Sequence, residues 1–246
     1  TKAFPNPLQD TIVLIKQFHL SATKSLEKED FIEAVKNLND AHRLTMLPKY
    51  NSYKPDIEIS IAELYYNLEY YDKAVMQVKE AIQNAKIYRN DYKLAKAYNL
   101  YAIILIGTRE YSKSEFYLSK ANSLAIKLED PELNAQIIFG QGLLAYRLGN
   151  YTDAITDFKI AAKSFNEQSL LYQETAANSS LADALSLIDP KKYQRPLPEA
   201  RQLLNLVSEV SSSEGFSKFL IENHRIKSQI LIAEKRGKLG EEELKY

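Results

Sequence analysis

The sequence of 246 residues contains no cysteine, which excludes disulfides, thiolate metal ligands and cysteine nucleophiles together. It has no excess of either charge, because 32 Lys and Arg residues balance 32 Asp and Glu residues. The chain therefore has no net positive charge that would attract nucleic acid. No run of about 18 apolar residues is present to cross a membrane as a helix. Tryptophan is absent, and only 7 glycines and 8 prolines occur, which favours a helical domain.

Signatures of catalysis and of metal binding are also missing. The three histidines, His19, His42 and His224, lie far apart and show neither HxxxH nor HExxH spacing. The Gly140-Gln141-Gly142 segment lacks the further glycine and the preceding strand that dinucleotide binding requires, so close helix packing explains its glycines better. We therefore predict a protein that is not an enzyme and uses no cofactor and no metal.

What the chain does contain is a repeat of 40 residues. Phe31, Tyr71, Tyr111 and Tyr151 share this spacing, and each is followed at +3 and +10 by small residues. Another small residue lies nine positions before each aromatic. The small residues are Ala22, Ala34, Ala41, Ala62, Ala74, Ala81, Ala102, Ser114, Ala121, Gly142, Ala154 and Ala161. Such a period predicts stacked supersecondary units, each burying its apolar face against its neighbours.

The spacing within a unit predicts two helices. The first small residue lies on helix A, where two backbones approach closely, and the aromatic begins helix B. The small residues at +3 and +10 share one face of helix B, because separations of three, four and seven return to the same stripe. Leu148-Gly149-Asn150 and Leu68-Glu69-Tyr70 are predicted to form turns between the helices.

This layout resembles the tetratricopeptide repeat, which has a small residue in helix A, an aromatic at the turn and small residues in helix B. The match is clearest in GLLAYRLGNYTDAITDFKIA, from Gly142 to Ala161. The common repeat has about 34 residues, so longer helices are expected here. Repeats of this length resemble the sensor regions of Bacteroidetes-type histidine kinases and transcriptional regulators, and those of peptide-responsive Rap-like regulators. The resemblance implies an all-α, right-handed α-solenoid of stacked antiparallel helix pairs.

The boundaries follow from the period. We predict a linker over residues 1–10 and one solenoid over 11–246, with repeats at 15–54, 55–94, 95–134, 135–174 and 175–214 and a partial sixth at 216–246. A proline-bounded loop at 189–196 interrupts the fifth repeat, with helix B restarting near Leu197 or Pro198. Ala182, Ala200 and Ser228 are predicted to occupy the later small positions. Glu241 to Tyr246 is expected to begin a further helix B, as in a fragment of a longer protein.

In tetratricopeptide stacks helix A lines the concave face, so the resemblance also implies a binding surface. Its inward positions carry aromatic, amide and charged side chains, a set that suits an extended peptide or a helix. Tyr66, Phe139 and Tyr146 could equally fill the core between helices. The predicted face comprises Lys16, His19, Asp56, Ser60, Glu63, Tyr66, Asn67, Lys96, Asn99, Ile103, Gln136, Phe139, Leu143, Tyr146, Arg147, Ser179, Asp183, Arg225 and Gln229.

We therefore predict a non-enzymatic module that binds a protein or peptide. The first hypothesis is the sensor or interaction region of a bacterial signalling or transcriptional regulator, with the periplasmic side of a membrane favoured over the cytoplasm. The alternatives are a free-standing scaffold and a Rap-like peptide receptor, and a homodimer is open. A chaperone adaptor is not expected, because His19, Thr23 and Leu100 stand where that family uses Lys, Asn and Arg to hold a carboxylate.

Overall fold

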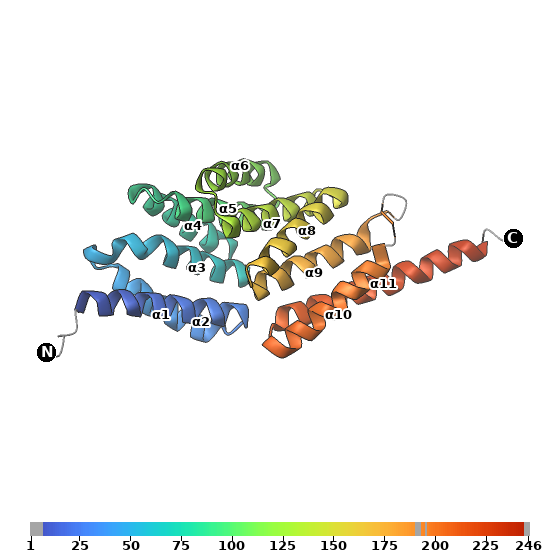
Figure 1. The fold of residues 1–246 in the computed structure, drawn as a ribbon, viewed down its shortest axis with the longest axis horizontal. Helices are drawn as coiled ribbons and strands as arrows, with labels where there is room; N and C mark the ends of the chain where they lie inside the picture. Colours follow the sequence, from blue (N-terminus) through green and yellow to red (C-terminus); the bar gives the residue numbers. More distant parts are fainter. Residues whose placement is uncertain (1–6, 190–192, 195, 244–246) are drawn as a thin grey trace. The chain divides into compact units, whose positions relative to one another are not determined.

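The computed structural model describes residues 7–189, 193–194 and 196–243, and every regular element in these ranges is helical (Figure 1). The helices alternate with turns of about three residues along most of the chain. Their bounds are α1 (Pro7–Glu27), α2 (Phe31–Thr45), the 3-10 helix η1 (Pro48–Tyr53), α3 (Lys54–Asn67), α4 (Tyr71–Ile87), α5 (Asp91–Gly107), α6 (Tyr111–Leu128), α7 (Pro131–Arg147), α8 (Tyr151–Glu167), α9 (Leu171–Leu187), α10 (Pro196–Glu214) and α11 (Ser217–Glu243). The predicted all-α class is confirmed.

Each of the four repeated aromatics is the first residue of a helix, as predicted. Phe31, Tyr71, Tyr111 and Tyr151 begin α2, α4, α6 and α8. The alanines at the small positions of the first four repeats are fully buried, and Ala182 and Ala200 continue this series at 0% exposure. Where the series has Ser114 instead, its hydroxyl donates a hydrogen bond of 3.0 Å to the carbonyl oxygen of Ala102. The register of the repeat is therefore confirmed as far as α10.

The glycines of α7 are explained by packing. A Cβ atom at Gly142 would lie 2.8 Å from the ring of Phe158 on α8, closer than real Cβ contacts come. At Gly140 it would lie 2.7 Å from the Asn99 side-chain oxygen and 3.0 Å from Leu118. Both glycines thus allow a close approach of side chains from other helices, as the sequence predicted.

Most turns between helices share one backbone conformation that the sequence does not predict. Eight turns contain a residue with a positive φ, and in six of them it is not glycine. In most of these turns the backbone N–H after that residue bonds to a carbonyl five residues earlier, as from Tyr70 to Tyr65 at 2.8 Å and from Asn150 to Ala145 at 2.9 Å. The left-handed residues are Glu29, Glu69, Arg89, Arg109, Glu129, Gly149, Ser169 and Gly215.

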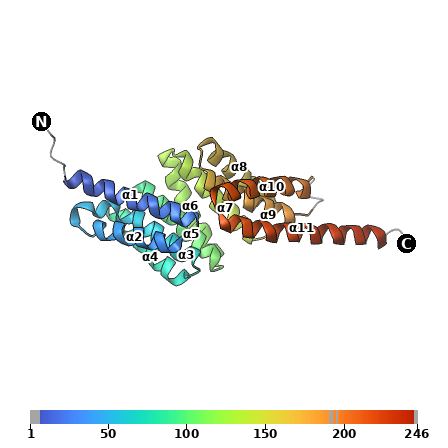
Figure 2. The same cartoon turned by 90° about the horizontal axis from the view of Figure 1, so that it is seen from below.

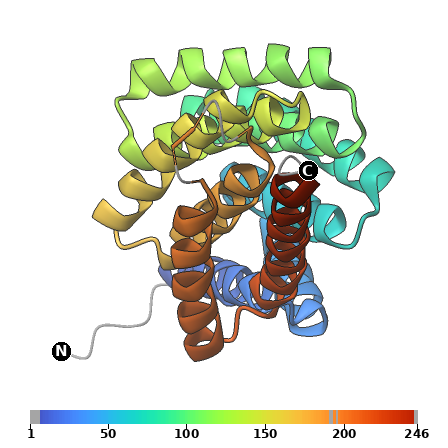
Figure 3. The ribbon, with the colours of Figure 1, turned by 90° about the vertical axis from the view of Figure 1, so that its right-hand side faces the viewer.

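The chain divides into two compact units, residues 1–140 and 141–246, with the division inside α7. In the first unit α1 packs on α2, α3 on α4 and α5 on α6, and the A helices α1, α3 and α5 are neighbours (Figures 1 and 2). In the second unit α9 packs on α8, α10 and α11, and α10 and α11 lie side by side (Figure 3). Each unit thus stacks adjacent helix pairs, as in tetratricopeptide repeats.

Two predicted boundaries were wrong. Residues 7–10 belong to α1 rather than to a linker. The predicted restart of helix B near Leu197 or Pro198 agrees with the start of α10 at Pro196, whose fixed φ suits a first helical turn. Glu241–Glu243 do not begin a new helix, because α11 passes through Gly237 and Gly240 without a turn. Residues 190–192, 195 and 244–246 of the predicted loop and end lie outside the described residues.

The last predicted small position was also wrong. Ser228 is exposed, because α11 buries a face formed by Phe219, Asn223, Ile226 and Ile230. These residues follow one another at spacings of four, three and four, which places Ser228 on the other side of the helix. The small-residue register therefore ends before α11.

Candidate functional site

The predicted face begins in the first unit with a polar contact between α1 and α3. His19 Nε2 and the Ser60 hydroxyl lie 2.8 Å apart, and Ser60 is buried. Burial lowers the pKa of His19. The Asp56 carboxylate raises this pKa, whereas the cations Lys96 and Lys93 lower it further. A neutral imidazole therefore joins two successive A helices at this point of the face.

Charged groups gather beside that contact on α3, α5 and α7. Asp56 pairs with Lys93 at 2.6 Å, and the Lys93 ammonium also donates to the carbonyl oxygen of Ser52 at 2.8 Å. Burial raises the pKa of Glu63, an effect that Lys96 reduces. The cluster therefore contains both a closed ion pair and a half-buried carboxylate.

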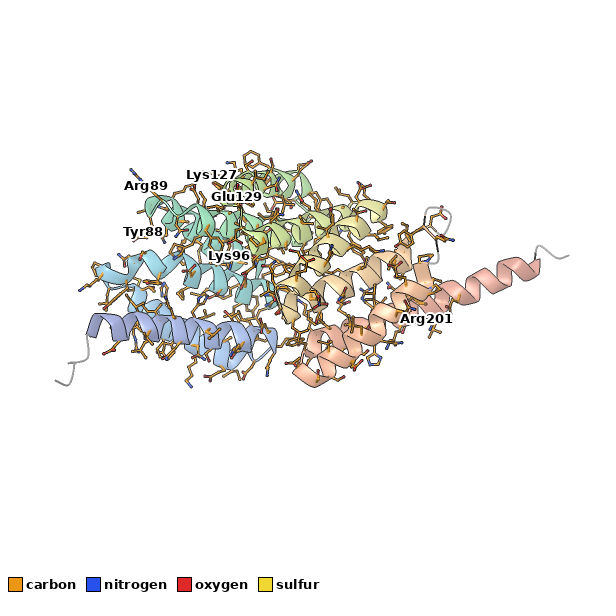
Figure 4. All side chains as sticks on the ribbon, in the orientation of Figure 1. Tyr88, Arg89, Lys96, Lys127, Glu129 and Arg201 are labelled. Carbon is orange, nitrogen blue, oxygen red and sulfur yellow. The ribbon has the colours of Figure 1, made fainter. Side chains whose placement is uncertain are left out.

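Lys96 is the second cation of this cluster, beside Lys93, and is labelled on α5 in Figure 4. Burial alone would lower its pKa, but Tyr92, Glu63, Glu132 and Asp56 outweigh burial and raise it. Lys96 consequently stays charged, with carboxylates from α3 and α7 around it. Such a site can hold a zwitterionic or charged group of a ligand.

Asn99 lies one turn further along α5. It is 7% exposed, and its amide nitrogen donates to the carbonyl oxygen of Gln136 over 3.4 Å, a long hydrogen bond. Its amide oxygen is buried and has no hydrogen-bond donor among the described residues. A buried acceptor left in this way costs about 1–3 kcal/mol. The described residues therefore leave the acceptor capacity of the Asn99 amide unused.

The aromatic residues of the predicted face pack against the aromatics that begin the B helices. Tyr66 meets Tyr71 edge to face with ring centroids 6.0 Å apart, and Tyr146 meets Tyr151 in the same way at 5.7 Å. Tyr66 and Tyr71 also close around Gly107, where a Cβ would lie 3.3 Å and 3.0 Å from their rings. Tyr66 and Tyr146 thus take part in packing between helices. This is the interpretation of the sequence in which they fill the core rather than bind a ligand.

In the second unit the face is organised around a buried carboxylate. Asp183 on α9 accepts a hydrogen bond of 2.8 Å from the Tyr146 hydroxyl of α7 and an ion pair of 2.6 Å from Arg225 of α11. Arg225 also bonds to Glu222 at 2.8 Å. Burial and the Asp183 carboxylate raise the pKa of Tyr146, so its hydroxyl remains a donor. Three predicted residues from three A helices thus meet in one network.

The other predicted residues are more loosely placed. Lys16 is exposed, and Arg147 is exposed with its guanidinium 5.9 Å from the centre of the Tyr146 ring. Gln136 donates to Glu132 at 2.9 Å, whereas the Gln229 side-chain oxygen is buried and has no donor among the described residues. Ser179 is buried, and the half-buried remainder comprises Asn67, Ile103, Phe139 and Leu143. A common binding role for the whole set stays a prediction.

Sequence reasoning missed three charged residues that complete these clusters. Lys93, Glu132 and Glu222 fall outside the inward positions of the repeat, yet they contact or polarise predicted residues. The signal for Lys93 and Glu132 would have been an opposite charge about one repeat away, as for Asp56 and Lys93, whereas Glu222 lies three residues before Arg225 on the same helix. Within the described ranges no group of three or more potential ligands could hold a metal ion, and no helix is long and apolar enough to cross a membrane.

Comparison with known proteins gives relatives by structure only. No family model and no curated protein matches the chain. The fold is similar to a Rap protein in complex with Competence and Sporulation Factor, with a TM-score of 0.70 and 19% identity over 88% of this chain and 59% of that one. It is also similar to aspartyl phosphate phosphatase F of Bacillus subtilis, with a TM-score of 0.62 and 18% identity over 96% and 60% of the two chains.

A third similar structure is the Rap conjugation gene regulator of plasmid pLS20 in complex with the Phr* peptide, with a TM-score of 0.55 and 14% identity over 95% of this chain and 79% of that one. The chain spans about three fifths of the length of the first two structures. At these identities the likeness shows the fold, a tetratricopeptide-type helical repeat. It lends no support to the narrower resemblance to histidine kinase sensor regions.

Proposed function

We propose that the chain is a receptor for a short peptide, which binds along the A helices of the first unit. The observation that carries the proposal is Asn99, whose buried amide oxygen has no donor among the residues that the structure describes. A side-chain amide offers one acceptor and two donors, which matches the N–H and C=O of an extended peptide backbone. Turning the Asn99 side chain away from Gly140 of α7 would exchange its long bond to Gln136 for bonds to a ligand.

The charges around Asn99 suit the same ligand. Lys96 presents a cation and Glu63 a half-buried carboxylate from neighbouring A helices. Short peptides carry both a terminal carboxylate and a terminal ammonium, so this pair can fix the direction of the bound chain. The fold supports the proposal, because two of the similar structures are complexes with a named factor or peptide. The role is one of binding, and no catalytic step is proposed.

The receptor proposal takes up the Rap-like alternative of the sequence interpretation and goes with a cytoplasmic location rather than a periplasmic one. The earlier hypothesis of a sensor region joined to an output domain is a separate proposal. It needs the same binding face, and no described residue favours it over a free-standing receptor.

The test uses an array of random hexapeptides probed with the labelled chain, followed by calorimetric titration of the strongest peptide. Asn99→Ala should weaken that peptide about tenfold, which corresponds to about 1.4 kcal/mol. Asn39→Ala, an exposed asparagine of the B helix α2, is the matched control and should change the affinity less than twofold. Equal affinity of parent and Asn99→Ala for every selected peptide would refute the proposal.

A further inference from the structure

Three lysines of the first unit lie over tyrosine rings on the B-helix side. Lys79 Nζ of α4 is 5.8 Å from the centre of the Tyr101 ring. Lys86 Nζ of α4 and Lys120 Nζ of α6 are 5.9 Å and 5.6 Å from the centre of the Tyr98 ring. Lysines of two B helices thus lie over rings of the A helix α5. The helices α4 and α6 both pack against α5 (Figure 1). We call Lys79, Lys86, Lys120, Tyr98, Tyr101, Phe116 and Tyr117 the lysine–tyrosine patch.

The floor of the patch is a packed aromatic cluster. The Tyr117 ring lies 4.5 Å from that of Tyr101, 5.6 Å from that of Tyr98 and 5.3 Å from that of Phe116, measured between ring centres. Tyr98 and Tyr101 are buried, at 6% and 7% exposure, whereas Phe116 is exposed. The rings therefore form a fixed base of low polarity, over which an unpaired charge is screened less than in open water.

Two acids near the patch are already paired. Glu110 pairs with Lys113 on the same turn, and Asp91 pairs with Lys127 at 2.7 Å. Lys127 is labelled at the end of α6 in Figure 4. Within the described part of the chain, Lys79, Lys86 and Lys120 form no ion pair. Three exposed lysines over one ring cluster can therefore pair with the carboxylates of a partner.

The spacing of the lysines suits a protein segment. Lys79 and Lys86 are seven residues apart on one helix, which is about 10.5 Å at 1.5 Å per residue. Three residues of an extended chain cover about 10 Å. Nucleobases are a poorer fit, because they need exposed ring faces on which to stack, and of the four patch rings Tyr98 and Tyr101 are buried and Phe116 alone is exposed.

We propose that the lysine–tyrosine patch binds an acidic segment of a partner protein, whose carboxylates pair with Lys79, Lys86 and Lys120. The patch lies on other side chains than the peptide face built around Asn99, so it would give the chain a second, independent partner. Charge pairs at such a surface mainly set the rate of encounter and the choice of partner, and they weaken as salt is added.

The test measures fluorescence anisotropy of a labelled twelve-residue peptide with eight glutamates and four alanines, at low and at physiological salt. The parent should bind it, and the peptide with glutamine in place of glutamate should not bind. The triple variant Lys79→Gln, Lys86→Gln, Lys120→Gln should lose at least tenfold in affinity. All three lysines are exposed, so the fold should be kept, as circular dichroism would verify.

The matched control is Lys24→Gln, Lys28→Gln, Lys218→Gln, which removes the same charge from exposed sites elsewhere and should change the affinity less than twofold. Equal losses in both triple variants, or no saturable binding by the parent up to about 1 mM peptide, would overturn the proposal. Tighter binding to phosphatidylserine vesicles or to a dT12 oligonucleotide would assign the patch to a membrane or to nucleic acid and overturn it as well. A hexapeptide selected on the array should bind the patch variant as it binds the parent, which separates the two proposals.

Discussion

Arg225 of α11 and Asp183 of α9, 42 residues apart in the chain, form an ion pair of 2.6 Å in which the two partners differ in burial. The arginine side chain is 45% exposed, but that of the aspartate is only 11% exposed. The second oxygen of Asp183 is buried and has no donor among the described residues. The ion pair therefore offsets part of the free-energy cost of burying most of the Asp183 carboxylate.

We expect Arg225→Gln to lower the free energy of unfolding by about 1–3 kcal/mol, because it leaves the Asp183 carboxylate buried with one neutral donor. The measurement is urea unfolding followed by circular dichroism. The matched control is Arg201→Gln, which breaks an ion pair of equal length to Glu234, whose side chain is 37% exposed. The control should cost under about 1 kcal/mol, as exposed pairs do. Equal losses would mean that Asp183 is not the reason for the effect.

The turns give a prediction about backbone strain. Arg109 has a φ of 63° in a region that non-glycine residues populate at a cost of about 1–2 kcal/mol. Glycine removes that cost but loses more entropy on folding. We therefore expect Arg109→Gly to raise the free energy of unfolding by up to about 1 kcal/mol.

The reverse change is made at Gly149, whose φ is 80°. No atom lies within 4 Å of a Cβ placed there, so Gly149→Ala tests the backbone conformation alone and should destabilise by about 1 kcal/mol. Both variants are measured by urea unfolding. An unchanged Gly149→Ala variant would show that these turns relax at little cost.

The fold was largely predictable because packing leaves a periodic trace in the sequence. Small residues such as Ala62 and Ala74 leave space for the aromatic ring that begins helix B. The period of these residues therefore predicts where each helix pair lies. The left-handed turns were not predictable from Glu69 or Arg109, because neither residue type signals a positive φ. The period of small residues did not predict the buried face of α11, because that face carries Phe219, Ile226 and Ile230 in place of small residues.

The candidate site was less predictable than the fold. The inward positions included His19 and Ser60, and also Tyr146, Asp183 and Arg225, but the contacts among them come from the structure. The positions do not tell which side chains are satisfied within the chain and which are left with unused bonding capacity. That distinction depends on exact distances, such as the 3.4 Å between Asn99 and Gln136, and only the structure supplies them.

Overpacking tests the register of the small residues. Ala102 is fully buried on α5, and its carbonyl oxygen accepts the Ser114 hydroxyl of α6. Ala102→Leu should lower the free energy of unfolding by about 1–3 kcal/mol, because the added carbons have no space between the two helices. Ser119→Leu adds a comparable side chain at an exposed position of α6 and should cost under about 0.5 kcal/mol. A thermal melt in which both variants match the parent would contradict the placement of Ala102 at a helix contact.

The His19–Ser60 contact predicts how stability depends on pH. Burial lowers the pKa of His19 in the folded chain from the ordinary value of 6.5, so the unfolded chain binds the proton more readily. The contribution of His19 to stability should therefore be constant above about pH 7, fall as the pH drops through 6.5, and level off below the folded pKa. His42, whose pKa burial also lowers, acts in the same direction. In His19→Gln the decline in the free energy of unfolding, measured with urea between about pH 7.5 and 5.5, should become shallower without vanishing, because His42 still contributes. A His19→Gln profile parallel to that of the parent would show that the imidazole is not held neutral between α1 and α3.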